Sequence, residues 1–122
     1  MVAIHSKPPA LTLRAGTDAI AHLREYGLRA EDVDIVPGAA GGPKALGING
    51  LDQAVFGDFL PRAPRRRTLI GASIGSWRFA AIAMGEDPAQ GLERLAELYT
   101  RQRFPKGITS REVSHRCAAM LS

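Results

Sequence analysis

Residues 68–77 read T-L-I-G-A-S-I-G-S-W, and this stretch decides the fold of the chain. It predicts a strand at 68–70, a sharp turn, and an apolar helix over 74–84. The turn matches G-x-S-x-G, the nucleophile elbow, in which a serine lies at the tip of a strand-to-helix turn. Its neighbours must be small because strand and helix approach closely there. We therefore predict that Ser73 is a catalytic nucleophile. The predicted elbow comprises Gly71, Ala72, Ile74 and Gly75.

A second glycine-rich turn lies upstream, where residues 37–44 read P-G-A-A-G-G-P-K. It follows a β-branched run at 33–36, predicted to be a buried strand, and it opens a helical pattern over 44–60. Successive glycines leave backbone N–H groups unshielded, and such a turn binds anions. We predict that it supplies an oxyanion hole one strand away from Ser73. The predicted donors are the N–H groups of Gly38, Gly41 and Gly42.

A phosphate-binding loop of a nucleotide-binding protein is the competing interpretation of this turn. Such a loop requires G-x-x-x-x-G-K-[ST]. In this chain Pro43 separates Gly42 from Lys44, and Ala45 replaces the Ser or Thr that would hold Mg²⁺. The sequence therefore favours an oxyanion hole, and it predicts no metal and no cofactor.

The remaining elements follow the order of an α/β protein. A first helix is predicted to open at Thr17 or Gly16 and to stop at Gly27. Two further helices are predicted near the C-terminus from their capping residues, Asp87 with Pro88 and Thr109 with Glu112. The βαβα pattern with glycine-rich turns predicts a parallel sheet with helices on both faces. The inner face of the helix at 44–60 is predicted to carry Ile48, Leu51, Val55 and Phe59.

Over residues 33–101 the order of motifs resembles that of the patatin-like phospholipases. In that family the glycine-rich turn forms the oxyanion hole beside a basic residue, whose place Lys44 takes here, and the serine works in a dyad with an aspartate. The resemblance implies a serine lipid acyl hydrolase, a phospholipase or esterase, that acts on a lipid or acyl ester through an acyl-enzyme on Ser73. Family domains are longer, so residues 1–122 are expected to be one N-terminal portion of a hydrolase domain, incomplete on its C-terminal side, with 1–10 as a loose leader.

The chain departs from the family pattern at its general base. The family aspartate lies in an Asp-Gly-Gly or Asp-Gly-Ala turn, and this sequence contains neither tripeptide. The dyad aspartate is therefore expected beyond this chain, and a chain truly ending at Ser122 is expected to be inactive. The three histidines, His5, His22 and His115, are candidates, but His115, the only one after Ser73, is interpreted as a surface residue. The alternative is a non-catalytic module that binds an anionic lipid headgroup.

The composition is that of one small globular domain. The 122 residues are 45% apolar and 23% charged, with a net charge of +4. Positive charge gathers in R-A-P-R-R-R at 62–67 and in a cluster at Arg101, Arg103 and Lys106. Neither group is interleaved with aromatic residues on which bases stack, so nucleic acid is not predicted as a partner. We interpret the run at 62–67 as a solvated loop, with peripheral contact to an anionic membrane surface as the alternative.

The sequence also bears on the compartment. A single cysteine, Cys117, allows no disulfide within the chain and fits a reducing environment. No apolar run reaches the roughly 18 residues that span a bilayer. The N-terminal segment has no apolar core of signal-peptide length. These features predict a cytoplasmic protein.

Overall fold

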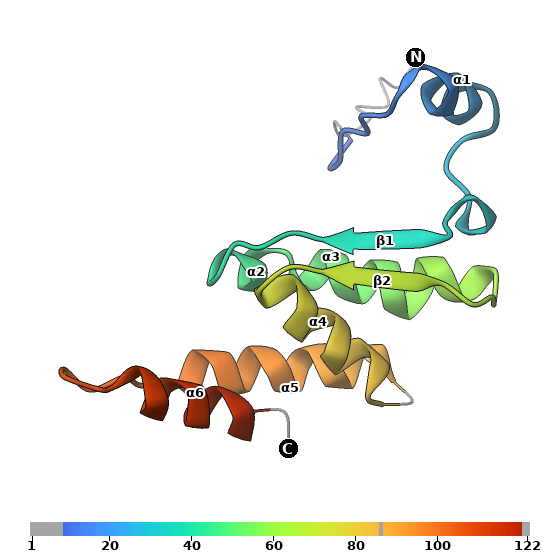
Figure 1. Cartoon of the computed structure of the whole chain (residues 1–122). Helices are drawn as coiled ribbons and strands as arrows, with labels where there is room; N and C mark the ends of the chain where they lie inside the picture. The colour runs from blue at the N-terminus through green and yellow to red at the C-terminus, as the bar shows by residue number, and fades with distance from the viewer. Residues whose placement is uncertain (1–8, 86, 121–122) are drawn as a thin grey trace, which may run out of the picture.

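The computed structural model describes residues 9–85 and 87–120, which form a mixed α/β fold around a two-stranded parallel sheet (Figure 1). The strands are β1 (Ile35–Gly38) and β2 (Thr68–Gly71). The α-helices are α1 (Thr17–Tyr26), α2 (Lys44–Gly47), α3 (Asn49–Ala54), α4 (Ile74–Ala83), α5 (Pro88–Arg101) and α6 (Ser110–Ala119). Three short turns complete the set, the 3-10 turns η1 (Ala30–Asp32) and η3 (Leu60–Arg62) and the π-helical turn η2 (Val55–Phe59). None of the helices in these ranges has the length and apolarity needed to cross a membrane.

The two strands pair in parallel, and the intervening segment carries α2 and α3 across from one strand to the next (Figure 1). The register places Ile35 opposite Thr68 and Gly38 opposite Gly71. The strand predicted at 33–36 is therefore displaced by two residues, and Pro37, expected to end it, lies inside β1. A proline fits an edge strand whose missing N–H faces away from the partner. β1 has such a free edge in this two-stranded sheet.

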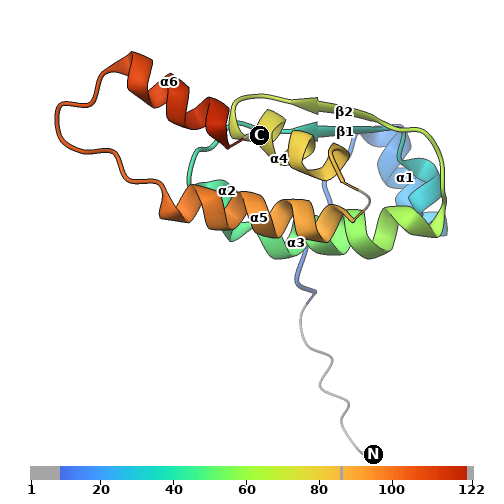
Figure 2. The same cartoon turned by 90° about the horizontal axis from the view of Figure 1, so that it is seen from below.

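The described helices cover one face of the sheet. Figure 2 shows α3, α4 and α5 on the same side of both strands. Val36 and Leu69 point toward this side and pack against the buried core. Ile35 and Ile70 point the other way, and each is 57% exposed. Within residues 9–85 and 87–120, helices on both faces, as predicted, are therefore not found. The buried core consists of Phe56, Leu60, Phe79, Ile82 and Leu92.

The predicted helix over 44–60 is divided into short segments. α2 ends at Gly47, and Ile48 (φ −103°, ψ 6°) leaves helical geometry before α3 begins. After α3 the chain widens into the π-helical turn η2. Glycines at three positions of this segment weaken a regular helix, since each costs backbone entropy relative to alanine. The break and the wide turn bring a different set of residues to the core.

The buried residues of this segment are Asp52, Phe56 and Leu60, while Val55 and Phe59 of the predicted inner face are half-buried against the core. Leu51, which was expected inside, is 40% exposed, as is Ile48. The physical reason is an ion pair that draws Asp52 inward. Its carboxylate accepts hydrogen bonds from Arg78 of α4, from Nε at 2.6 Å and from Nη2 at 2.5 Å. The two side chains are only 7% and 10% exposed, so the pair lies in the interior.

The helix ends follow the predicted capping residues. α1 begins after Gly16 and ends at Gly27, whose φ of 72° is readily adopted only by glycine. Asp87 caps α5, with its Oδ1 accepting the Ala89 N–H at 2.9 Å. At α6 the predicted capping box is present, with Thr109 and Glu112 each bonded to the other's backbone N–H. These local signals are confirmed because a cap depends only on residues within one turn of the chain.

The buried ion pair predicts an unequal response to two matched substitutions. Asp52→Asn leaves the Arg78 guanidinium without its counter-charge in the interior, and the free energy of unfolding is expected to fall by about 3–5 kcal/mol. Asp58→Asn breaks the exposed pair of Asp58 with Arg62, whose side chains are 70% and 64% exposed, and is expected to cost at most about 1 kcal/mol. Urea unfolding of both variants measures the difference. Equal losses would show that Asp52 and Arg78 contribute no more than a surface pair.

Candidate functional site

Ser73 lies in the sharp turn between β2 and α4, in the position that G-x-S-x-G predicts. Its backbone has φ 52° and ψ −123°, and it is the only non-glycine residue with positive φ among those described. A backbone in such a sparsely populated region costs about 1–3 kcal/mol and persists only where the surrounding structure imposes it. The residue is exposed, so its hydroxyl is open to solvent. The local geometry is that of a nucleophile elbow.

Two glycines of the motif make this turn possible. A Cβ atom on Gly71 would lie 2.3 Å from the backbone nitrogen of Ser76, at the start of α4. A Cβ atom on Gly75 would lie 2.3 Å from the carbonyl oxygen of Gly38, at the end of β1. Both distances are far inside van der Waals contact, and both contacts are to backbone atoms that cannot rotate away. The spacing of the two glycines therefore has a steric cause.

The glycine-rich turn begins directly beside this elbow. The Gly38 carbonyl accepts a hydrogen bond from the Ala72 N–H at 2.9 Å. Gly38, predicted as an oxyanion donor, is thus the buried last residue of β1 and contacts the elbow through its carbonyl. The structure therefore brings together the two motifs that lie more than thirty residues apart in the sequence.

Several backbone N–H groups near the elbow remain open. Within the described part of the chain, the N–H groups of Gly41, Gly42 and Ile74 donate no hydrogen bond. The carbonyls of Gly41 and Gly42 face the start of α2, where they accept the N–H groups of Lys44 (3.2 Å) and Ala45 (3.1 Å). Gly42 has φ 53°, which strains any other residue. Open N–H groups at a helix start and in a glycine turn attract negative charge.

A cavity of about 400 Å³ opens between the glycine-rich turn, α3 and α4. Residues 36–41 line one part of it, and its lining is mostly apolar. Ile74, the residue after Ser73, lines the cavity, whereas Ser73 itself does not. Phe79 belongs to both the buried core and this wall. The apolar side chains of the cavity wall include Ile48, Leu51, Val55, Phe56, Ile74 and Phe79.

No described histidine contacts Ser73. The His22 ring lies near α1 and pairs with Asp32, with Nε2 and Oδ1 3.1 Å apart. The pKa of Asp32 is held below its usual value, chiefly by the hydrogen bond from the Arg29 N–H and to a smaller extent by His22. His115 is exposed on α6, and His5 lies outside the described residues.

Two aspartates that could be considered as the base, Asp52 and Asp87, have other partners. Asp52 is paired with Arg78, and Asp87 caps α5. Among residues 9–85 and 87–120, the hydroxyl of Ser73 forms no hydrogen bond to a carboxylate or an imidazole. In the same ranges, no group of three or more His, Cys, Asp or Glu side chains is placed to hold a metal ion.

The basic run at 62–67 makes mainly internal contacts. Arg62 pairs with Asp58, and Arg65 pairs with Asp34 at 2.5 Å. The Arg67 guanidinium donates to three backbone carbonyls, each at 2.9 Å, which belong to Ala30, Val33 and Ala63. These arginines tie the basic loop to the segment before β1, a role that the sequence interpretation of a solvated loop did not include.

Arg78 is the residue near the site that the sequence interpretation missed. It is the only charged side chain in α4, whose sequence is otherwise small or apolar. A charged residue inside an apolar helix is almost never buried without a partner. This rule signals a buried pair, but it does not identify Asp52, which lies on a different helix and 26 positions earlier.

The glycine contacts predict that the elbow tolerates no added methyl group. Gly75→Ala is expected to lower the free energy of unfolding by at least about 1–3 kcal/mol, because its Cβ overlaps the Gly38 carbonyl. Gly50→Ala is the control, since a Cβ at this helical position meets nothing within 4 Å and is expected to add roughly 0.5–1 kcal/mol. Thermal or urea unfolding measures both. A Gly75→Ala protein as stable as Gly50→Ala would contradict the close approach.

Comparisons with known proteins add no family to this geometry. No protein-family model, no curated protein and no solved structure matches the chain. The function of the site is therefore inferred from its own residues and their arrangement.

Proposed function

We propose that this chain carries the nucleophile and the oxyanion hole of a serine esterase of the patatin-like lipid acyl hydrolase type. The backbone of Ser73 is the observation that carries the proposal. A serine that merely caps a helix has an extended backbone, and its side chain accepts an N–H from the first turn. Ser73 has φ 52° and makes no such side-chain hydrogen bond. A helix cap therefore does not explain why this strained residue is a serine.

The surrounding groups suit acyl transfer. Ser73 Oγ would attack the carbonyl carbon of an ester, and the oxygen of that carbonyl would become a tetrahedral oxyanion. The open N–H groups of Gly41, Gly42 and Ile74 are the proposed donors to this oxyanion, assisted by the positive end of the α4 dipole. Collapse of the intermediate would expel the alcohol and leave an acyl-enzyme, which water then hydrolyses. The apolar cavity beside Ile74 offers space for an acyl chain.

The reaction also needs a general base, because a serine hydroxyl is a weak nucleophile without one. The family resemblance assigns this role to an aspartate in an Asp-Gly-Gly or Asp-Gly-Ala turn, and neither occurs in these 122 residues. The proposal therefore assigns to this chain the nucleophile and the oxyanion donors, and it assigns no described residue as the base.

The absence of a base among the contacts of Ser73 in the described ranges favours one other function, a non-catalytic module. In that case the open N–H groups of the glycine-rich turn, with the exposed Lys44 beside them, would hold an anionic lipid headgroup. The two functions differ in the reactivity of Ser73. A nucleophile forms a covalent bond with an electrophilic phosphonate, whereas a binding module does not.

A fluorophosphonate probe separates them. Nucleophilic attack by Ser73 Oγ on phosphorus expels fluoride and leaves a stable phosphonyl serine, so we expect mass spectrometry to find one label, at Ser73. Ser73→Ala is expected to lose labelling completely. Ser76→Ala is the matched control, because Ser76 is exposed in the first turn of α4, three positions after Ser73, and it should label like the unaltered chain. A folded protein in which Ser73 stays unlabelled would overturn the esterase proposal and leave the binding module.

A further inference from the structure

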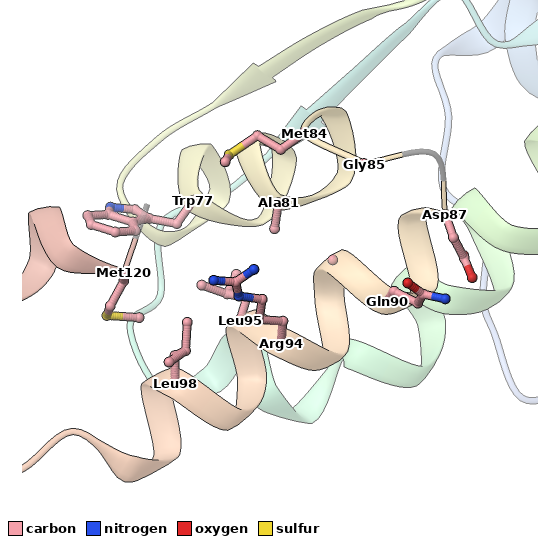
Figure 3. Close-up of a pocket in the computed structure, with 11 residues that line it drawn as sticks. Trp77, Ala81, Met84, Gly85, Asp87, Gln90, Arg94, Leu95, Leu98 and Met120 are labelled. Carbon is pink, nitrogen blue, oxygen red and sulfur yellow. The ribbon is translucent and has the colours of Figure 1, made fainter. Parts of the chain in front are cut away.

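A second cavity of about 400 Å³ lies between α4, α5 and α6 (Figure 3). It shares no lining residue with the cavity beside the glycine-rich turn. Its lining is largely apolar. One of the lining side chains, Met84, is 66% exposed to solvent. A concave site with apolar walls and a few polar groups is the usual form of a small-molecule binding site, and its volume falls in the range of roughly 300–1,000 Å³ that such sites occupy. The apolar lining side chains are Trp77, Ala81, Met84, Leu95, Leu98 and Met120.

Arg94 of α5 supplies a positive charge to this cavity. Figure 3 shows its side chain directed from α5 toward α4. Within the described residues, Arg94 forms no ion pair and no hydrogen bond, as is also true of Arg66 and Arg111, but Arg94 alone of these three lines the cavity. A guanidinium presents a planar fork of donors that matches a carboxylate. Arg94 is exposed, so an anion can reach its guanidinium from solvent.

The carboxylate that lines this cavity is already engaged. Asp87 accepts the Ala89 N–H as the N-cap of α5. In Figure 3 it lies beside Gln90, toward one end of the cavity, while Met120 lies toward the other. Among the described residues, Asp87 therefore caps α5 and makes no ion pair with Arg94.

We propose that this cavity binds a single-chain amphiphile with a carboxylate head, the chemistry of a medium-chain fatty acid. The carboxylate pairs with Arg94, and the alkyl chain lies against Trp77, Met84 and Met120. The two methionines are unbranched and polarisable, so their side chains adapt to a flexible chain. Such a ligand meets both features of the site, since a small inorganic anion would leave the apolar walls uncovered and a neutral hydrocarbon would leave Arg94 unpaired. Binding here does not depend on any catalytic role of Ser73.

Trp77 provides a direct measurement, because it is the only tryptophan of the chain and lines the cavity. Titration with decanoate, below its micellar concentration, is expected to change the tryptophan fluorescence in a saturable way. Between octanoate and dodecanoate, each added methylene is expected to tighten binding about four-fold. Decanol, with the same chain and no charge, is expected to bind about ten-fold or more weakly.

Variants of Arg94 test the head-group contact. Arg94→Gln is expected to weaken decanoate binding about ten-fold or more, with decanol binding unchanged. Arg94→Lys keeps the charge and is expected to retain most of the affinity. Arg111→Gln removes an equivalent charge from an exposed position of α6 that does not line the cavity, and it should bind like the unaltered chain. Circular dichroism confirms that each variant is folded.

Two results would overturn the proposal. One is a tryptophan fluorescence that does not change saturably with decanoate, or that changes equally in Arg94→Gln and in the unaltered chain. The other is loss of the response in Ser73→Ala, which would place the ligand at the elbow instead. If the phosphonate does not label Ser73 but decanoate still binds in an Arg94-dependent way, the esterase proposal is wrong and the fatty-acid site is supported. The two proposals can therefore be tested separately.

Discussion

The contact between the backbones of Gly38 and Gly75 is the constraint on which the site depends. It brings the first turn of α4 against the end of β1, at a distance that no side chain could share. The chain between β2 and α4 must then reverse within two residues, and Ser73 takes up the strain of that reversal in its backbone. The same contact places the glycine-rich turn beside the elbow. A side chain added at Gly75 would force the elbow and the glycine-rich turn apart.

The ion pair between Asp52 and Arg78 also helps to hold the glycine-rich turn and the elbow in place relative to each other. α3 follows the glycine-rich turn and α4 follows the elbow, so a bidentate contact between them fixes one motif relative to the other. A buried ion pair is a poor source of net stability, since the cost of removing two charges from water offsets much of their attraction. Its directional hydrogen bonds do restrict how the two helices can slide. We interpret the pair as a determinant of geometry more than of stability.

The features that sequence analysis predicted correctly are local. The sharp turn at Ser73, the glycine-rich turn at 37–44 and the caps at Asp87 and Thr109 each depend on a few neighbouring residues, so a short pattern is sufficient. The errors concern contacts between distant segments. Pro37 is tolerated in β1 because of where the partner strand lies. The inner face at 44–60 is set by Asp52, whose partner belongs to another helix. The number of sheet faces that helices cover likewise depends on contacts between distant segments, so a short pattern does not predict it.

The strained backbone of Ser73 bears on why a serine and not a glycine occupies this position. Glycine would adopt the same φ and ψ without a clash, which would recover about 1–3 kcal/mol of strain against roughly 0.5–1 kcal/mol of extra chain entropy. A glycine at position 73 would thus give a more stable fold than the serine does. The side chain at this position opposes the stability of its own turn, a mark of residues kept for chemistry or recognition. The side chain that lowers the stability of this turn is thus the same hydroxymethyl group that is proposed to carry the function.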